Sequence, residues 1–212
     1  QYYHAYNHQI DSSLQLETKR KTGSTMQRVK TTGLPDHIDY GLKIIFVGIN
    51  PSVRSAQLGH HYAGHSNRFW KLLNEAKFID VPLTYHDDWR LPEWGYGLTN
   101  IVDQPTAGIK DLTTQDYLEG RTRLLDKAEH YQPRIIALLG ITMKNILLSR
   151  DLKTSLDRKK SQISSPIGLQ HQDFGGSLVF VLPNPSGRNA HYSFHNMLRL
   201  FRQLRRLSQK IS

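Results

Sequence analysis

Three short segments of this 212-residue chain are apolar at every position, and they constrain its fold more than any other feature. They are residues 44–47, 135–139 and 178–182. A strand that is apolar on both sides is typical of a parallel sheet whose two faces are covered by helices. The sequence therefore predicts an α/β fold, a three-layer α/β/α sandwich with a central, mainly parallel four- to five-stranded sheet.

The segments between these strands supply the covering helices and the remaining strands. Apolar residues recur at helical spacing after Phe69, from Thr113 or Thr114 to Tyr131, around residues 143–148, and from Phe194 to Leu207. Residues 97–102 are expected to add a short strand, and the polar stretch 151–176 an edge strand. The residues between Pro51 and Phe69 are expected to form a loop.

One domain accounts for most of the chain. Residues 1–38 show little apolar periodicity and contain basic residues from Lys19 to Lys30, so we expect a basic, mostly disordered arm. Such an arm could scan DNA or carry a nuclear address, or it could be a solvated tail without function. Residues 39–212 then form a single domain, expected to be a monomer. No window approaches the apolar length of a membrane span, so no membrane contact is expected.

Charge and composition narrow the classes of function. The formal net charge is +10, with 28 Lys and Arg against 18 Asp and Glu, and no acid follows Gly187. This excess favours a polyanionic partner, although a basic protein that is merely soluble has the same composition. The chain has no cysteine, which excludes disulfides, thiol nucleophiles, cysteine-zinc sites and iron–sulfur clusters.

Two unusual loops follow predicted strands and are expected to share one cleft. They read GINPS at 48–52 and PNPSGR at 183–188. The ends of parallel strands meet at one edge of a sheet, where ligand sites of α/β proteins lie. The first loop has no Asp, Glu or Cys, and the amide of Asn50 cannot take a proton near neutral pH. Asn50 could instead hold a water or read the edge of a base.

The other polar residues of the loops leave alternatives open. His60, His61 and His65 form an HHxxxH run, in which hydrogen bonding to a ligand is favoured over metal because no carboxylate or cysteine accompanies it. Spacing alone favours exposed loop histidines without any role over both. Tyr62 could stack on a flat ligand or pack on the core. Ser186 and Gly187 suit a phosphate, and Arg188 could clamp a phosphate, act as a wedge, or be solvated.

Several motifs in order resemble one known family. GINPS, GHHY, NRFW, LTN and PNPSGR, with TAGIKDL, EGR and YQPR between them, are similar to the mismatch-specific uracil/thymine DNA glycosylases, a branch of the uracil-DNA glycosylase superfamily. The resemblance runs from about Lys43 to the final helix. It leaves the arm and residues 151–176 without a match.

The resemblance implies roles for individual residues. Asn50 would be catalytic, positioning a water against C1′ of a flipped nucleotide with help from Thr99. Tyr62 would stack on the extruded pyrimidine and His61 would contact it. Arg188 would fill the gap that the flipped base leaves. The implied base pocket comprises Ile49, Pro51, Ser52, Ser55, His61, Tyr62 and Asn67, and the DNA contacts of the second loop comprise Arg188, Asn184, Ser186, Gly187 and Asn189.

Three positions depart from the family pattern. Ser52 stands where relatives commonly have Gly, Ser55 where thymine glycosylases have Ala, and Ile141 where relatives have Lys. The two serines put the substrate range in question, above all activity on thymine with its extra methyl group. Ile141 removes one expected phosphate contact.

The activity implied is that of a monofunctional DNA glycosylase without cofactor or metal. It would hydrolyse the N-glycosidic bond of uracil, thymine or 5-substituted pyrimidines in G·U and G·T mismatches. Double-stranded DNA and downstream abasic-site repair enzymes are the implied partners, and the nucleus the implied location. Two other hypotheses are a catalytically silent protein that binds mismatches or abasic sites, and an α/β enzyme acting on a small phosphorylated ligand.

Overall fold

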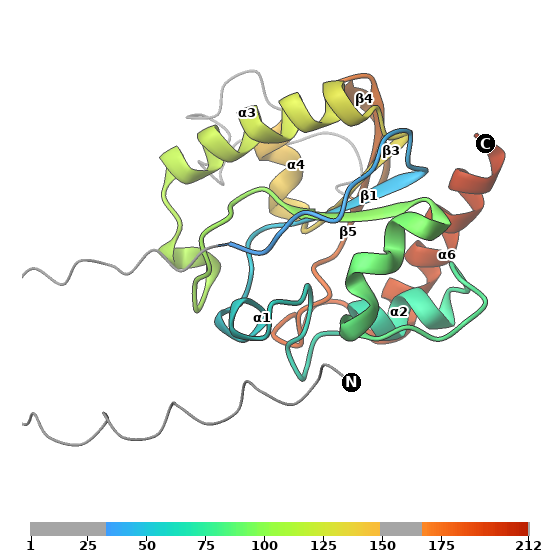
Figure 1. Cartoon of the computed structure of the whole chain (residues 1–212), viewed down its shortest axis with the longest axis horizontal. Coiled ribbons are helices and arrows are strands. Elements are labelled where there is room, and N and C mark those ends of the chain that lie inside the picture. The colour runs from blue at the N-terminus through green and yellow to red at the C-terminus, as the bar shows by residue number, and fades with distance from the viewer. Residues whose placement is uncertain (1–32, 149–166, 212) are drawn as a thin grey trace, which may run out of the picture.

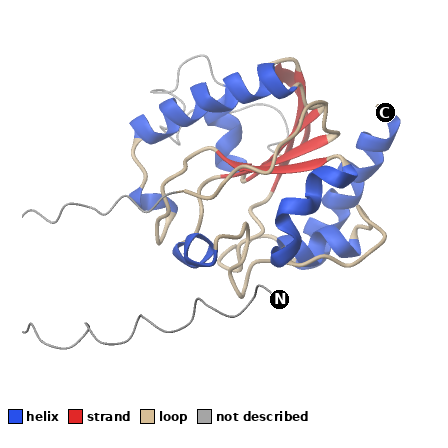
Figure 2. Ribbon diagram, in the orientation of Figure 1, coloured by secondary structure: helices blue, strands red, loops and turns tan. Residues whose placement is uncertain are grey.

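The computed structural model describes residues 33–148 and 167–211, and a five-stranded sheet forms the centre of the fold (Figures 1 and 2). The strands lie in the order β2-β1-β3-β5-β4. Neighbours among the first four are parallel, while β4 pairs antiparallel with β5 at one edge. The bounds are β1 Ile44–Gly48, β2 Tyr96–Asn100, β3 Ile135–Leu139, β4 Gly168–Phe174 and β5 Ser177–Leu182. The predicted mainly parallel sheet is thereby confirmed, including its edge strand.

Helices cover both faces of this sheet, as Figure 1 shows. Side chains of α2 (Phe69–Glu75) and α6 (Phe194–Lys210) form one buried cluster with one face of the strands. Side chains of α3 (Thr114–Tyr131) and α4 (Ile141–Leu148) form a second cluster on the opposite face. Alternate residues of β1 divide between the clusters, Phe46 entering the first and Val47 the second, as strand geometry requires. The three-layer prediction is confirmed.

The prediction of a continuous loop between Pro51 and Phe69 is wrong. A short helix, α1 (Val53–Leu58), follows the first loop. The Ser52 hydroxyl caps it by accepting a hydrogen bond from the Ser55 amide, and Gly59 ends it in the left-handed conformation with φ of 74°. Two 3₁₀ helices, η1 (Tyr85–Trp94) and η2 (Ile109–Asp111), interrupt the irregular segments.

The folded domain begins before the predicted boundary between residues 38 and 39. The backbone of His37 pairs with that of Leu98, and the Asp36 carboxylate lies 2.6 Å from Lys127 Nζ. Residues 33–38 are therefore part of the fold. The rest of the predicted arm and, of the predicted segment 151–176, residues 151–166 lie outside the described residues. Within residues 33–148 and 167–211, no helix combines the length and apolarity of a membrane span.

Candidate active site

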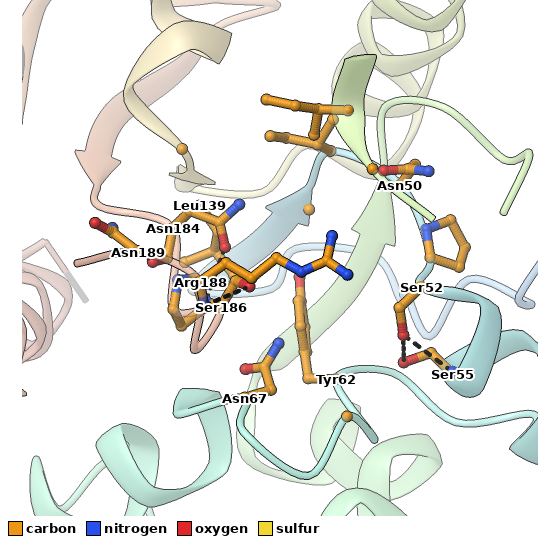
Figure 3. A pocket seen from close by; sticks show the side chains of 18 of the residues that line it. Asn50, Ser52, Ser55, Tyr62, Asn67, Leu139, Asn184, Ser186, Arg188 and Asn189 are labelled. Atoms are coloured by element: carbon orange, nitrogen blue, oxygen red, sulfur yellow. Dashed lines mark hydrogen bonds between the residues drawn. The ribbon is translucent and has the colours of Figure 1, made fainter. Parts of the chain in front are cut away.

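A cleft of about 970 Å³ opens at the carboxyl edge of the parallel strands (Figure 3). The loops after β1 and β5 both line it, together with the ends of β2 and β3, as the sheet topology predicts. No Asp, Glu or Lys stands among the described residues that line it, and its two lining arginines are Arg54 and Arg188. The cleft is therefore suited to an anionic ligand and holds neither a carboxylate base nor an amine nucleophile.

Asn50 is held by its amide nitrogen. Nδ2 donates to the carbonyl oxygen of Gln104 at 3.1 Å and to Thr106 Oγ1 at 2.8 Å. The Thr106 hydroxyl in turn donates to the Gly108 carbonyl oxygen at 2.8 Å, which leaves its oxygen to accept from Asn50. The described residues give no hydrogen bond to Asn50 Oδ1, and in Figure 3 this oxygen faces the middle of the cleft. An oriented acceptor of this kind can hold a water molecule.

Thr99 is the predicted catalytic residue that the structure does not bring to the cleft. Its side chain is fully buried, and its hydroxyl lies 2.5 Å from Asp36 Oδ1 and 3.1 Å from Lys127 Nζ. Successive side chains of a strand point to opposite sides, so the cleft receives Asn100 from β2 instead. The threonine beside Asn50 is Thr106. The sequence signal for Thr106 is the TAGIKDL motif that begins with it, but this motif alone gives no reason to assign Thr106 a role.

Tyr62 forms part of the cleft wall. One face of its ring stacks on Phe69 with a centroid separation of 4.3 Å and an interplanar angle of 29°. Its hydroxyl is buried without a hydrogen-bond partner among the described residues, and burial raises the pKa of Tyr62 above its ordinary value. A Cβ at Gly48 would lie 2.9 Å from this hydroxyl and 2.4 Å from Asn100 Oδ1. Glycine at position 48 thus allows both polar groups to approach the end of β1.

His61 lines the cleft, but its ring bonds to the protein framework. Nε2 lies 2.9 Å from the Pro35 carbonyl oxygen, so it must carry the proton. Burial, the largest influence, lowers the pKa of His61, and the ring is therefore neutral at neutral pH. The neighbouring His60 points to Asp88 instead, and His65 is exposed. The three histidines do not converge, and no group of three or more His, Cys, Asp or Glu among the described residues could hold a metal ion.

The two serines that depart from the family pattern bond to each other. Ser52 Oγ lies 3.0 Å from Ser55 Oγ, and the latter accepts a hydrogen bond from the Ala63 amide at 3.2 Å. Ser55 is buried, whereas Ser52 is exposed at the start of α1 (Figure 3). Both line the cleft, as do the predicted pocket residues Ile49, Pro51 and Asn67. Asn67 Oδ1 accepts from the Phe69 amide at 2.9 Å, and the described residues form no hydrogen bond with its Nδ2.

The second loop, residues 183–193, is organised around Arg68 of the NRFW motif. The Arg68 guanidinium donates to four carbonyl oxygens of this loop, at distances of 2.9 to 3.4 Å. The acceptors belong to Pro185, Ser186, Asn189 and Tyr192. The five donors of the planar arginine fork can serve four carbonyls at once, whereas the three donors of a lysine ammonium cannot. Sequence reasoning missed this role because all four acceptors lie more than 115 positions away.

The predicted DNA-contacting residues of the second loop differ in their availability. Arg188 is exposed and reaches across to the Ala107 carbonyl oxygen at 2.7 Å (Figure 3). Asn184 Oδ1 accepts from the Ser186 amide, and Asn189 Nδ2 donates to the Asn184 carbonyl, so these groups shape the loop itself. Gly187 is exposed outside the cleft lining, and a Cβ there would lie 2.4 Å from the Ser66 side chain.

Comparison with known proteins agrees with this geometry. The family model described as "Uracil DNA glycosylase superfamily" matches residues 35–205. The chain is 33% identical over 187 residues to the G/U mismatch-specific uracil DNA glycosylase of Schizosaccharomyces pombe. That alignment covers 86% of this chain but 56% of the relative, so the chain spans little more than half of that protein's length.

A solved structure shows the same fold. It is a solution NMR structure of a Methanosarcina acetivorans protein named as a candidate uracil DNA glycosylase. It superimposes with a TM-score of 0.50 at 18% identity, covering 82% of this chain and 98% of the other. At this identity the likeness concerns the fold alone. Since the family model matches most of the chain, the protein belongs to the uracil DNA glycosylase superfamily.

Proposed function

We propose that this protein is a monofunctional DNA glycosylase that excises uracil or thymine from G·U and G·T mismatches and so initiates base excision repair. The observation that carries the proposal is the orientation of Asn50. Two acceptors hold its nitrogen, and its oxygen remains open toward a cleft without acids. The bond is then hydrolysed by a water that Asn50 holds, because the described lining residues include no lysine that could form a covalent intermediate with the sugar.

The cleft offers a seat for an extruded pyrimidine. Phe69 covers one face of the Tyr62 ring, so a flipped base would stack on the opposite face. The Asn100 amide, which lines the cleft, then provides hydrogen-bonding groups for the edge of that base. Flipping costs least when the base is mispaired, so G·U and G·T sites are favoured before any pocket contact forms.

The electrostatics of the cleft suit the leaving group. Breaking the N-glycosidic bond leaves an oxocarbenium-like sugar and a pyrimidine anion. No described Asp or Glu lines the cleft to repel this anion, and backbone amides near residues 49–52 would stabilise it. Without a catalytic carboxylate the reaction is expected to be slow. Bases that leave more easily, such as 5-formyl and 5-fluoro pyrimidines, should be cut faster.

Single-turnover cleavage tests the proposal. Excess protein is incubated with labelled G·U, G·T and matched duplexes, and alkali then cuts the DNA wherever an abasic site has formed. We expect cleavage at G·U and none at matched pairs. Cleavage at G·T should be slower, because Ser52 and Ser55 make the pocket less favourable for the methyl group of thymine. Binding to mismatched DNA without abasic product would contradict the proposal and favour the silent mismatch binder. The nuclear location and the downstream repair partners stay predictions.

Replacing Arg188 by Ala should slow cleavage of G·T more than cleavage of G·U. Arg188 stands exposed at the mouth of the cleft, and its only hydrogen bonds among the described residues are to backbone or to Ser186 Oγ. To enter the space of a flipped base, its side chain has to give up the hydrogen bond to the Ala107 carbonyl. The methyl group makes thymine harder to seat in the pocket than uracil, so losing the wedge should slow cleavage of G·T by about tenfold more than cleavage of G·U. Equal losses for both duplexes in single-turnover assays would refute the wedge role, and Arg199→Ala, at an exposed position of α6 outside the cleft lining, is the control.

A further inference from the structure

Asp88 is a buried carboxylate that the proposed chemistry does not use. It lies in η1 outside the cleft lining, with 1% of its surface exposed. Oδ2 accepts from the backbone amide of His61 at 2.7 Å, and Oδ1 lies 3.0 Å from His60 Nδ1. Oδ1 also accepts from the Trp89 amide at 2.8 Å. One side chain thus joins η1 to the two residues that precede Tyr62.

The surroundings of Asp88 keep it ionised. Burial acts to raise its pKa, but the nearby His37 ring and the hydrogen bonds from His60 and the His61 amide outweigh this and bring the pKa to about 2. His37 Nε2 lies 3.4 Å from Oδ2, and no Lys or Arg of the described residues forms an ion pair with this carboxylate. A buried anion surrounded by donors forms stronger hydrogen bonds than a neutral group would.

Asp88 is one of three contacts that immobilise His61. The ring Nε2 bonds to the Pro35 carbonyl, and the His61 carbonyl accepts from Trp70 Nε1 at 3.1 Å. The next residue, Tyr62, has a φ of 56°, in the left-handed region that a residue with a bulky side chain rarely adopts. Such a conformation persists only where the surroundings impose it. The anchors on His61 are what impose it here.

We infer that Asp88 is a positioning residue that holds the Tyr62 ring in place as the platform for the flipped base. The carboxylate touches neither the cleft nor the DNA, and it acts through the backbone of His61. The inference rests on the proposed glycosylase function, because the platform matters only if a base is extruded onto it. A structural role without this link would leave the effects of Asp88 and Tyr62 substitutions independent of each other.

A double-mutant cycle tests the inference on G·U duplex under single-turnover conditions. Asp88→Asn keeps the size of the side chain but places an NH₂ group where one acceptor oxygen was. We expect it to slow cleavage by roughly 10- to 100-fold, as a displaced binding group does. In a Tyr62→Ala background the same change should slow cleavage by no more than about twofold, since the platform is already gone. Binding of abasic-site duplex, which lacks the base, should stay within about twofold of wild type.

Two further variants complete the test. Asp87→Asn is the matched control, because Asp87 lies beside Asp88 but, among the described residues, its side chain contacts only Thr84 and Arg90. His60→Gln removes the Nδ1 donor to the same carboxylate, and it replaces Asp88→Asn in the cycle if that variant does not fold. If wild type cleaves, but the rate losses of Asp88→Asn and Tyr62→Ala multiply in the double variant, the inference is wrong and the proposed function still stands. Absence of cleavage by wild type would overturn the proposed function, and this inference with it.

Discussion

Replacing Asn50 by Ala should abolish excision while leaving DNA binding intact. The change removes the oriented oxygen of Asn50, and no acid stands among the described lining residues to hold the water in its place. Loss of a group that positions and polarises the nucleophile typically costs about 10²- to 10⁴-fold in rate. The single-turnover rate on G·U duplex should fall by that factor. The dissociation constant for the same duplex should change by less than about threefold, because Asn50 is one of many contacts.

Two companion variants sharpen this prediction. Thr106→Val should lose only part of the activity, because the Gln104 carbonyl still holds Asn50 Nδ2 when the Thr106 hydroxyl is gone. Asn196→Ala, on the exposed first turn of α6, should cut at the wild-type rate. If Asn50→Ala retained wild-type cleavage, the assigned mechanism would be wrong. A loss of rate with Thr99→Val but not with Thr106→Val would instead support the sequence-based assignment of Thr99 as the residue that assists Asn50.

Replacing Arg68 by Lys should damage both stability and activity despite the retained charge. The guanidinium serves four carbonyl oxygens of the second loop, and an ammonium group on a single stem can reach only some of them. Hydrogen bonds of charged donors contribute about 1.5 to 3 kcal/mol each, so a net loss of about 2 to 4 kcal/mol in the free energy of unfolding is expected. Urea unfolding measures this loss.

The same variant should also cut G·U duplex more slowly, by at least about tenfold, because the loop that carries Arg188 loses its scaffold. Arg90→Lys is the control: Arg90 is paired with Glu93 at the surface, and its replacement should change stability by less than about 0.5 kcal/mol. Wild-type stability and cleavage in Arg68→Lys would show that the loop holds its shape without the guanidinium.

Much of the fold could be predicted from the sequence, because its signals are local. Apolar runs with β-branched residues mark β1, β3 and β5, and the helical spacing of apolar residues marks α2, α3 and α6. The sequence predicts that α3 begins at Thr113 or Thr114, and the Thr113 hydroxyl caps it by accepting a hydrogen bond from the Asp116 amide. The exception, α1, is six residues long and begins with a β-branched residue, so it has too few turns to show a periodicity.

The cleft was predictable in outline and not in its contacts. Parallel strands place their carboxyl ends together, so the two loops had to meet, and the absence of acids and cysteine in the first loop already made Asn50 a holder of water. Which threonine supports Asn50 depends on strand alternation and on the path of the chain after β2. Side-chain direction reverses with each residue, so Thr99 turns to Asp36 while Thr106 meets Asn50 across 56 positions.

The residues that support the cleft without lining it could be identified only from the tertiary structure. Arg68 reads in the sequence as one more basic residue, and Asp88 as one more acid in a polar segment. Their roles arise because folding carries each to partners 27 to 124 positions away, where burial makes every unpaired donor or acceptor costly. Local composition and spacing record which groups a chain possesses and which elements it forms. Only the packing of those elements determines which groups are desolvated together, and therefore which of them hold the cleft in shape.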